Sequence, residues 1–260
     1  MDNQFAPIID AARQGGEQLK KYFGRHLDII NEKLGPADLQ TTADLESERA
    51  VLAILNKHYP DYNIFSEEVG MIDRGSDFTF YIDPLDGTNN FVLGIPYFSC
   101  SIALVQGHNV IFAAVYSPIT DNLYYAQRGQ GAFLNSQPIK VNVETAIDRC
   151  TVGYNTGYDV SDEENLKITR PILALDIKRL LINWSPALDL CLLASGRIEA
   201  IVVNRGEWHD FLAGHLIAQE AGAIITDFFG QVREHDQVKS FVVANSSAVS
   251  QKIVSIAKDF

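Results

Sequence analysis

Apolar residues recur every three or four positions in two segments near the N-terminus of the chain. Over residues 5–23 this spacing predicts a helix that buries one of its faces. A second helix is predicted over 41–60, where Thr42 or Asp44 can accept hydrogen bonds from the amides of the first turn. We therefore expect the chain to begin with two helices.

The pattern changes to short apolar runs from residue 78 onward. These runs are rich in Val, Ile, Phe and Tyr and are bounded by Gly, Asn, Asp and Pro, which is typical of strands separated by turns. We predict strands over 78–83, 98–107, 109–118 and 122–135, most of them antiparallel. Together with the two preceding helices, they indicate an α+β arrangement.

Strands and helices alternate after a polar stretch at 140–150. The predicted strands are 150–156, 198–203 and 240–247, and the predicted helices are 161–176, 185–197, 210–223 and 248–258. Such alternation is typical of an α/β arrangement. We therefore predict two domains, an N-terminal α+β domain over 1–143 that contains most of the candidate site and a C-terminal α/β domain over 144–260.

The composition restricts the classes of function. The 260 residues include 33 acidic and 21 basic side chains, giving a net charge of −12, which disfavours direct binding to nucleic acid or to a membrane surface. No apolar run reaches the ~18 residues of a membrane-spanning helix, and the N-terminal residues lack the pattern of a signal peptide. The three cysteines form no CxxC pair, which is typical of a reducing compartment. We expect a cytoplasmic protein.

The motif IDPLDGTNNF at 82–91 places two aspartates three residues apart, directly after an apolar run. Asp, Pro and Gly are ordinary turn formers, so Asp83 and Asp86 could belong to a simple turn. Alternatively, a strand ends at Asp83 and the motif forms a metal and phosphate site at the edge of a sheet. In that case the amides of Gly87 and Thr88 would face the phosphate, helped by the dipole of a helix that begins there.

Other carboxylates occupy comparable places along the chain. Asp44 and Asp210 each lie at the start of a predicted helix, and Glu67 follows a short apolar run. Each has a simple explanation, because the aspartates could be N-caps and the glutamate could lie in a solvated turn. The functional alternative is that Glu67 and Asp210 meet the two aspartates of the motif in space. The four would form an all-oxygen site for Mg²⁺, and paired ions of this kind clamp the attacking and leaving oxygens of phosphoryl transfer.

The ordered set of motifs resembles the inositol monophosphatase superfamily of magnesium-dependent, lithium-sensitive phosphatases. The stretch IDPLDGTNNF is similar to the family's first metal signature, and HDFLAGHLIAQEAG at 209–222 is similar to its C-terminal signature. Further segments match in the expected order, namely KLGPADLQTTAD, IFSEEVG, RGQGAFLNSQPI and ALDLCLLASGR. The resemblance covers the chain from about Ala11 to Asn245, and the ordered set is much more specific than any single motif.

The resemblance implies that two or three Mg²⁺ ions are the cofactor. Glu67, Asp83 and the main-chain carbonyl of Leu85 would hold the first ion. Asp83 would bridge to a second ion, which Asp86 and Asp210 would also hold. Glu67 would in addition hold a third, weaker ion through water.

The resemblance also implies catalytic and substrate-binding residues. Asp44 and Thr88 would activate the attacking water together with Glu67, and the adjacent Glu68 would support the site. Lys33 would lie near the active-site loop on the dimer side. The substrate would be bound by Leu85, Asp86, Gly87, Thr88, Trp184 and Asp210.

The chain departs from the family pattern at several positions of the substrate pocket. Trp184 and Pro186 stand where many members have small residues, so the pocket should be smaller or differently shaped. Val203 stands where inositol-preferring members have a glutamate that binds ring hydroxyls. His209 replaces the usual Trp before Asp210, and we interpret it as a packing substitution rather than a ligand or an acid. The metal ligands all match, whereas the residues for substrate specificity are altered.

The resemblance implies the family's layered α-β-α-β-α sandwich and a homodimer. We predict a Mg²⁺-dependent phosphomonoesterase that hydrolyses a small phosphorylated polyol or sugar, such as inositol 1-phosphate, by a metal-activated water. Fructose 1,6-bisphosphate, a nucleotide 3′-phosphate and histidinol phosphate are alternative substrates. A different class of function is a regulatory protein that binds the transcription machinery, as some bacterial family members do.

Overall fold

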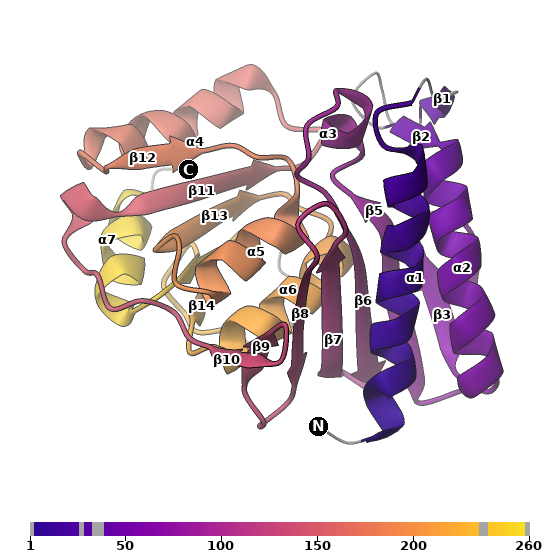
Figure 1. Ribbon diagram of the computed structural model, residues 1–260. Helices are drawn as coiled ribbons and strands as arrows, with labels where there is room; N and C mark the ends of the chain where they lie inside the picture. The colour runs from indigo at the N-terminus through magenta and orange to yellow at the C-terminus, as the bar shows by residue number, and fades with distance from the viewer. Residues whose placement is uncertain (1–2, 26–28, 33–38, 234–238, 258–260) are drawn as a thin grey trace.

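Helices and sheets alternate in five layers, in the order helix, sheet, helix, sheet, helix (Figure 1). The computed structural model describes residues 3–25, 29–32, 39–233 and 239–257. The layers agree with the predicted α-β-α-β-α sandwich. Among the described residues, no helix combines the length and the apolar character needed to cross a membrane.

The N-terminal part of the chain forms the first helical layer and the larger sheet. Its elements are η1 Asn3–Phe5, α1 Ala6–Tyr22, β1 Ile29–Glu32, β2 Leu39–Thr41, α2 Thr42–His58, β3 Asn63–Ser66, β4 Gly70–Ile72, β5 Phe78–Asp86, α3 Thr88–Val92, β6 Ser99–Gln106, β7 Asn109–Ser117, β8 Asn122–Gln127, β9 Ala132–Leu134 and β10 Gln137–Ile139. The larger sheet has the strand order β10-β9-β8-β7-β6-β5-β3-β4, with only β3 and β5 pairing in parallel.

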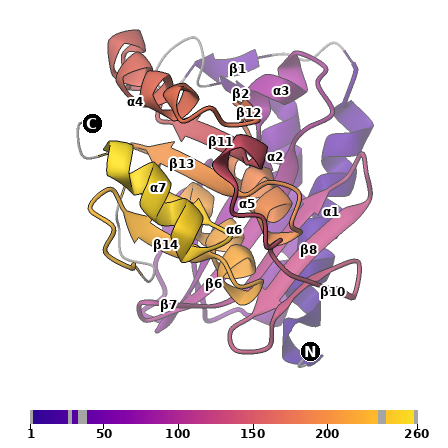
Figure 2. The ribbon, with the colours of Figure 1, turned by 90° about the vertical axis from the view of Figure 1, so that its left-hand side faces the viewer.

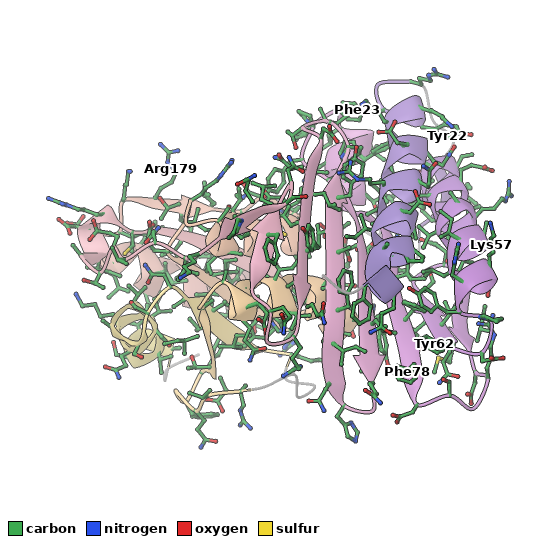
Figure 3. The ribbon with its side chains drawn as sticks, turned by 60° about the horizontal axis from the view of Figure 1, so that its bottom comes forward. Tyr22, Phe23, Lys57, Tyr62, Phe78 and Arg179 are labelled. Carbon is green, nitrogen blue, oxygen red and sulfur yellow. The ribbon has the colours of Figure 1, made fainter. Side chains whose placement is uncertain are left out.

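Helices α1 and α2 cover one face of this sheet (Figure 1). The close approach of α1 depends on Gly16, because a Cβ atom there would lie 2.4 Å from the ring of Tyr116. Aromatic rings pack at the edge of the same layer, where Tyr62 and Phe78 stack with centroids 4.6 Å apart (Figure 3). The N-terminal segment therefore builds a core of its own between the two helices and the sheet.

The C-terminal part of the chain forms the other three layers. Its elements are η2 Ile147–Arg149, β11 Thr151–Thr156, α4 Asp162–Ala174, β12 Arg179–Leu181, α5 Pro186–Ala194, β13 Ala200–Asn204, α6 Trp208–Glu220, β14 Ile224–Asp227, β15 Phe241–Ala244 and α7 Ser247–Ala257. The smaller sheet has the order β12-β11-β13-β15-β14, in which β12, β11 and β13 are parallel and the last two pairings are antiparallel.

Helices α5 and α6 lie between the two sheets, and α4 and α7 cover the outer face of the smaller one (Figures 1 and 2). Both middle helices are apolar on most sides, as expected for helices buried from two directions. One hydrophobic cluster runs from the larger sheet through these helices to the smaller sheet. The division at 143/144 therefore stays a prediction, because the core is continuous across it.

Most predicted elements are present, with two kinds of difference. Strand β5 does not end at Asp83, since it continues to Asp86 through an irregularity in its pairing with β6. Several short strands were not predicted from the pattern: β1, β2, β4, β10, β12 and β14. Strands of three or four residues are too short to show a clear alternation.

Candidate active site

Strand β5 supplies the central residues of the candidate site. Asp83, Leu85 and Asp86 are all buried near its end, and the amide of Leu85 donates to Asp83 Oδ1 at 3.0 Å. The pairing with β6 shifts between Asp83 and Asp86, as in a β-bulge. In a regular strand, residues three positions apart point to opposite faces of the sheet. The irregularity changes the direction of successive side chains, so Asp83 and Asp86 need not lie on opposite faces.

Gly87 makes the sharp turn that follows the strand. Its φ of 94° lies in the left-handed region, and a Cβ atom there would lie 3.0 Å from the carbonyl oxygen of Tyr97. Glycine is thus required both for its backbone conformation and for the close approach. Helix α3 begins at Thr88, as predicted, but it has only five residues, so its dipole is small.

Asp86 is held by hydrogen bonds from two distant parts of the chain. Ser99 Oγ of β6 donates to Asp86 Oδ2 at 2.9 Å, and Ser185 Oγ donates to the same oxygen at 2.5 Å. The amide of Ala187 lies 3.4 Å from Oδ1. Burial and, to a smaller extent, the charge of Asp189 raise the pKa of Asp86 from 3.8 to about 7, although these three hydrogen bonds lower it. Ser99 and Ser185 were not identified from the sequence, because neither lies in an acidic motif.

Asp83 lies where the predicted carboxylates come together. Burial raises its pKa well above the usual value, and the negative charges of Glu67, Asp86 and Asp210 raise it further. Glu67 is brought there by the link between β3 and β5, in which the Glu67 amide donates to the Ile82 carbonyl at 3.2 Å. Asp210 comes from the first turn of α6, which lies on the other side of the larger sheet. Within the part of the chain that the structure describes, the main charges that shift the pKa of Asp83 are acidic.

This donor set has the chemistry of a hard-cation site. Buried carboxylates that repel one another are stabilised by a divalent cation, and Mg²⁺ prefers oxygen ligands. As placed, however, no three Asp, Glu, His or Cys side chains within the described ranges gather tightly enough to hold an ion. The residues fit a metal by their chemistry and their mutual repulsion, while the coordination geometry stays a prediction.

Asp44 and Thr88 lie beside this cluster. Thr88 Oγ1 donates to the Leu85 carbonyl at 3.0 Å and lies 3.4 Å from Asp44 Oδ1. The N-cap of α2 is Thr41, so the expectation that Thr42 or Asp44 caps this helix is wrong. Asp44 is instead the third residue of the helix, and its carboxylate accepts from the amide and the hydroxyl of Thr41 in a capping box. Burial raises the pKa of Asp44 to about 7 despite these bonds, and the charges of Glu68 and Glu67 add to the increase.

The residues at which the chain departs from the family pattern have different environments. Val203 is fully buried in the core cluster between the sheets, so its side chain packs there. His209 Nε2 lies 3.2 Å from Asp210 Oδ1, and its ring lies 4.9 Å from that of Phe65. It contacts a proposed metal ligand as well as an aromatic ring, so its interpretation as a packing substitution stays a prediction. Pro186 is the first residue of α5, a position that suits its fixed φ. Lys33 and the side chain of Trp208 lie outside the described residues.

Glu68 lies near Asp44, whose pKa its charge raises, and Gln40 Nε2 of β2 donates to its Oε2 atom. The neighbouring amide of Val69 donates to Glu48 Oε1 of α2 at 3.1 Å. These contacts join the segment after β3 to the beginning of the chain's second helix. They support the segment that contains Glu67.

A buried network around Asp189 supports the other side of the site. Asp189 accepts hydrogen bonds from Tyr97 Oη at 2.7 Å, Asn183 Nδ2 at 2.7 Å and Asn155 Nδ2 at 3.0 Å. Burial raises its pKa, and these three bonds oppose the increase. Its position inside the apolar run ALDLCLLA was a sequence clue to such a network, since a buried carboxylate needs partners.

The chain is similar in sequence and in fold to known proteins over most of its length. A sequence model described as the inositol monophosphatase family matches residues 2–259. The chain is 32% identical over 253 residues to a fructose-1,6-bisphosphatase/inositol-1-monophosphatase of Aquifex aeolicus, which covers 96% of this chain and 93% of that protein. It is 35% identical over 230 residues to a Nus factor SuhB of Pasteurella multocida, covering 85% and 84%. The solved structure of an IMPase from Thermotoga maritima matches with a TM-score of 0.88 and 32% identity, covering 99% and 97%.

Proposed function

The chain belongs to the inositol monophosphatase family and is a phosphatase, and from this we propose that it hydrolyses a small phosphorylated polyol or sugar. The observation that supports the proposal most directly is the set of acidic groups around Asp83. Their burial and mutual repulsion raise its pKa, which is typical of a site that binds cations.

We propose that the cofactor is Mg²⁺, with two or three ions bound. Members of the family are generally metal-dependent, and the oxygen donors of this site suit a hard cation. Glu67, Asp83, the Leu85 carbonyl, Asp86 and Asp210 would hold the ions. When bound, Mg²⁺ would neutralise the phosphate charge and stabilise the attacking and leaving oxygens. Sensitivity to Li⁺ is part of the same proposal.

Thr88 and Asp44 would position the attacking water and accept its proton. The Thr88 hydroxyl lies 3.4 Å from Asp44 Oδ1, so a water that contacts the hydroxyl would also be near the carboxylate. A carboxylate with a pKa of about 7 is well matched to proton transfer near neutral pH. Glu67 would assist from the other side of the cluster.

The substrate phosphate would lie at the turn after β5. The phosphate would contact the end of β5 at Leu85 and Asp86, the turn residue Gly87 and the first residue of α3, Thr88. Asp210 and Trp184 would contact the organic part of the substrate. The two domains predicted over 1–143 and 144–260 would each contribute to the site, since Asp210 comes from the second. We also propose that the protein is a homodimer, as the family resemblance implies.

A panel of phosphomonoesters tests the proposal. The protein should release phosphate from inositol 1-phosphate, fructose 1,6-bisphosphate, a nucleotide 3′-phosphate or histidinol phosphate in the presence of Mg²⁺. Activity should be lost with a chelator and reduced by Li⁺. Absence of hydrolysis of every ester at saturating Mg²⁺ would refute the proposed function.

The relatives called Nus factor SuhB support a second candidate function, which is binding to the transcription machinery. Asp86→Asn separates the two functions because it removes a carboxylate of the site while leaving the surface unchanged. If the cellular phenotype of a gene deletion is complemented by this variant, the interaction is the function that matters. If the variant loses both complementation and hydrolysis, the catalytic function is the one that matters in the cell.

A further inference from the structure

Two aromatic side chains, those of Trp184 and Tyr158, lie at the border of the candidate site. We propose that they form a platform on which a ring of the substrate lies flat. This inference rests on the proposed function and narrows it, because it makes the substrate a ring-bearing phosphomonoester rather than an open-chain one.

The two rings form a pair that solvent reaches. Their centroids are 5.8 Å apart and their planes are inclined by 31°. Trp184 is 39% exposed and Tyr158 is 49% exposed, and neither belongs to the buried core clusters. Aromatic side chains that only fill a core are buried, whereas these two keep part of their apolar surface accessible to a ligand.

Trp184 is joined to the carboxylate cluster through its neighbour in the chain. Ser185 Oγ donates to Asp86 Oδ2 at 2.5 Å, and Ser185 Cβ lies 3.2 Å from the position that a Cβ atom would take on Gly87. The residue after Trp184 therefore touches the turn where the phosphate is proposed to bind. A substrate held at that turn would have its organic part near the indole.

Tyr158 reaches the same border from a different strand. It follows β11, whose last residue Thr156 pairs in parallel with Asn204, and the amide of Gly157 donates to the Asn204 carbonyl at 2.9 Å. The chain after Asn204 continues directly into α6 and Asp210. The platform thus borders the site next to Asp86 through one segment and next to Asp210 through the other.

The backbone fixes Trp184 in an unusual conformation. Its φ of 54° lies in the left-handed region, which bulky residues rarely adopt. Asn90 Nδ2 donates to the Asn183 carbonyl at 2.6 Å and lies 3.4 Å from the Trp184 carbonyl, while the Asn183 side chain is bound to Asp189. Strained conformations that neighbouring contacts enforce are concentrated at functional sites. The backbone that carries the indole is thereby held in place, and the ring itself contacts that of Tyr158.

The chemistry of the platform favours a ring. The flat face of an indole binds the apolar C–H face of a saturated ring or the π face of a nucleobase, and both burials remove apolar surface from water. An open-chain polyol presents no such face and loses more conformational freedom when it is ordered. The shared feature of the expected substrates is therefore a ring that is attached close to the phosphate.

Steady-state kinetics of Trp184→Ala and Trp184→Phe on three esters test the platform. The esters are inositol 1-phosphate with a saturated ring, adenosine 3′-phosphate with an aromatic base, and glycerol 2-phosphate with no ring. Trp184→Ala should raise KM about tenfold for at least one ring-bearing ester, as expected for the loss of one stacking contact. The rise in KM should be several-fold smaller for glycerol 2-phosphate, whose organic part has no ring face to lie on the indole. Trp184→Phe should restore most of the affinity.

Phe229→Ala is the matched control, because Phe229 is an aromatic residue with 79% exposure that lines a different pocket, beside α7. It should change none of these constants. A KM effect of Trp184→Ala that is equal for all three esters, or absent for both ring-bearing ones, would overturn the platform. The two ring-bearing esters identify which kind of ring is bound. Failure of the wild-type protein to hydrolyse any ester would instead refute the proposed function.

Discussion

The larger and the smaller sheet contribute differently to the candidate site. The larger sheet supplies Asp83 and Asp86 from β5, and Glu67 directly follows β3, the parallel neighbour of that strand. The side of the smaller sheet supplies residues from loops and helix starts, namely Asp210, Ser185 and Trp184. We infer that most of the proposed metal ligands come from the larger sheet, with Asp210 added from the other side, while substrate choice depends more on loops that can vary separately.

A buried carboxylate outside the site has a different electrostatic environment from that of Asp83. Asp227 of β14 is also buried, but hydrogen bonds from Gln231, Arg233 and Phe229 outweigh the effect of burial and lower its pKa. Arg233 lies 2.6 Å from its Oδ2 atom. A buried carboxylate with a cationic partner stabilises the fold, whereas the carboxylates around Asp83 have acidic neighbours. This contrast provides matched controls for the predictions below.

Asp86→Asn should have the largest effect on activity. Loss of one carboxylate should weaken binding of the Mg²⁺ that would stabilise the phosphate charge, and it should lower kcat roughly 10³-fold, which corresponds to several kcal/mol. The measurement is phosphate release at saturating substrate. Asp227→Asn is the control, because it should lower the free energy of unfolding by about 1–3 kcal/mol through its lost hydrogen bonds and leave kcat unchanged. Equal kcat in Asp86→Asn and the wild type would contradict the assignment.

Thr88→Ala should have the next largest effect. It removes the hydroxyl that lies between the Leu85 carbonyl and Asp44, so water positioning should suffer and kcat should fall roughly 10²-fold. Thr88→Ser keeps the hydroxyl and should retain most of the activity. A Ser variant as slow as the Ala variant would show that the methyl group, and hence packing, is what matters at this position.

Ser185→Ala tests the connection between the two sides of the site. The variant loses a hydrogen bond to a carboxylate, a type of bond that contributes about 1.5–3 kcal/mol. We expect about a tenfold loss in kcat/KM and a further rise in the pKa of Asp86, which would move the acidic limb of the pH–rate profile to higher pH. An unshifted profile would mean that Ser185 only positions the loop. Ser195→Ala, at the C-terminal end of α5, is a serine control outside the site.

The stability of the metal-free protein should also depend on pH. In metal-free buffer, the pKa values of Asp44 and Asp86 are raised from 3.8 to about 7, so the folded state binds these protons more tightly than the unfolded state does. The resulting stabilisation is complete below about pH 4 and is lost as the pH rises through about 7. Denaturant titrations with a chelator should therefore show a decreasing free energy of unfolding over this interval. The decrease should be smaller in Asp86→Asn, and an equal slope in both proteins would contradict the prediction.

The helices, the longer strands and the acidic motif at 82–91 could be predicted because their determinants are local, whereas the layered sandwich was implied by the family resemblance. The strand β5 ends in a motif that places Asp83 and Asp86 near a glycine turn, and the helices have regular apolar spacing. The hydrogen-bond partners of these carboxylates could not be predicted in the same way. Ser185 is 99 residues away from Asp86 in the sequence, and nothing in its own segment indicates the contact.

The substrate side could be predicted less completely for a similar reason. The resemblance places Val203 at the substrate pocket, yet this side chain packs in the core, because alternation along β13 directs it between the sheets. Tyr158 could not be identified from the sequence, since a tyrosine in a loop has no distinctive pattern. Its proximity to Trp184 follows only from the parallel pairing of β11 with its neighbours.

The left-handed backbone of residue 184 has a consequence for changing the substrate range. Glycine adopts this conformation without steric cost, so Trp184→Gly would relieve the local backbone while it empties the space of the indole. A protein engineer could thus remove this exposed aromatic surface at a single position, without moving the loop that supports it. Libraries aimed at bulkier substrates should begin there.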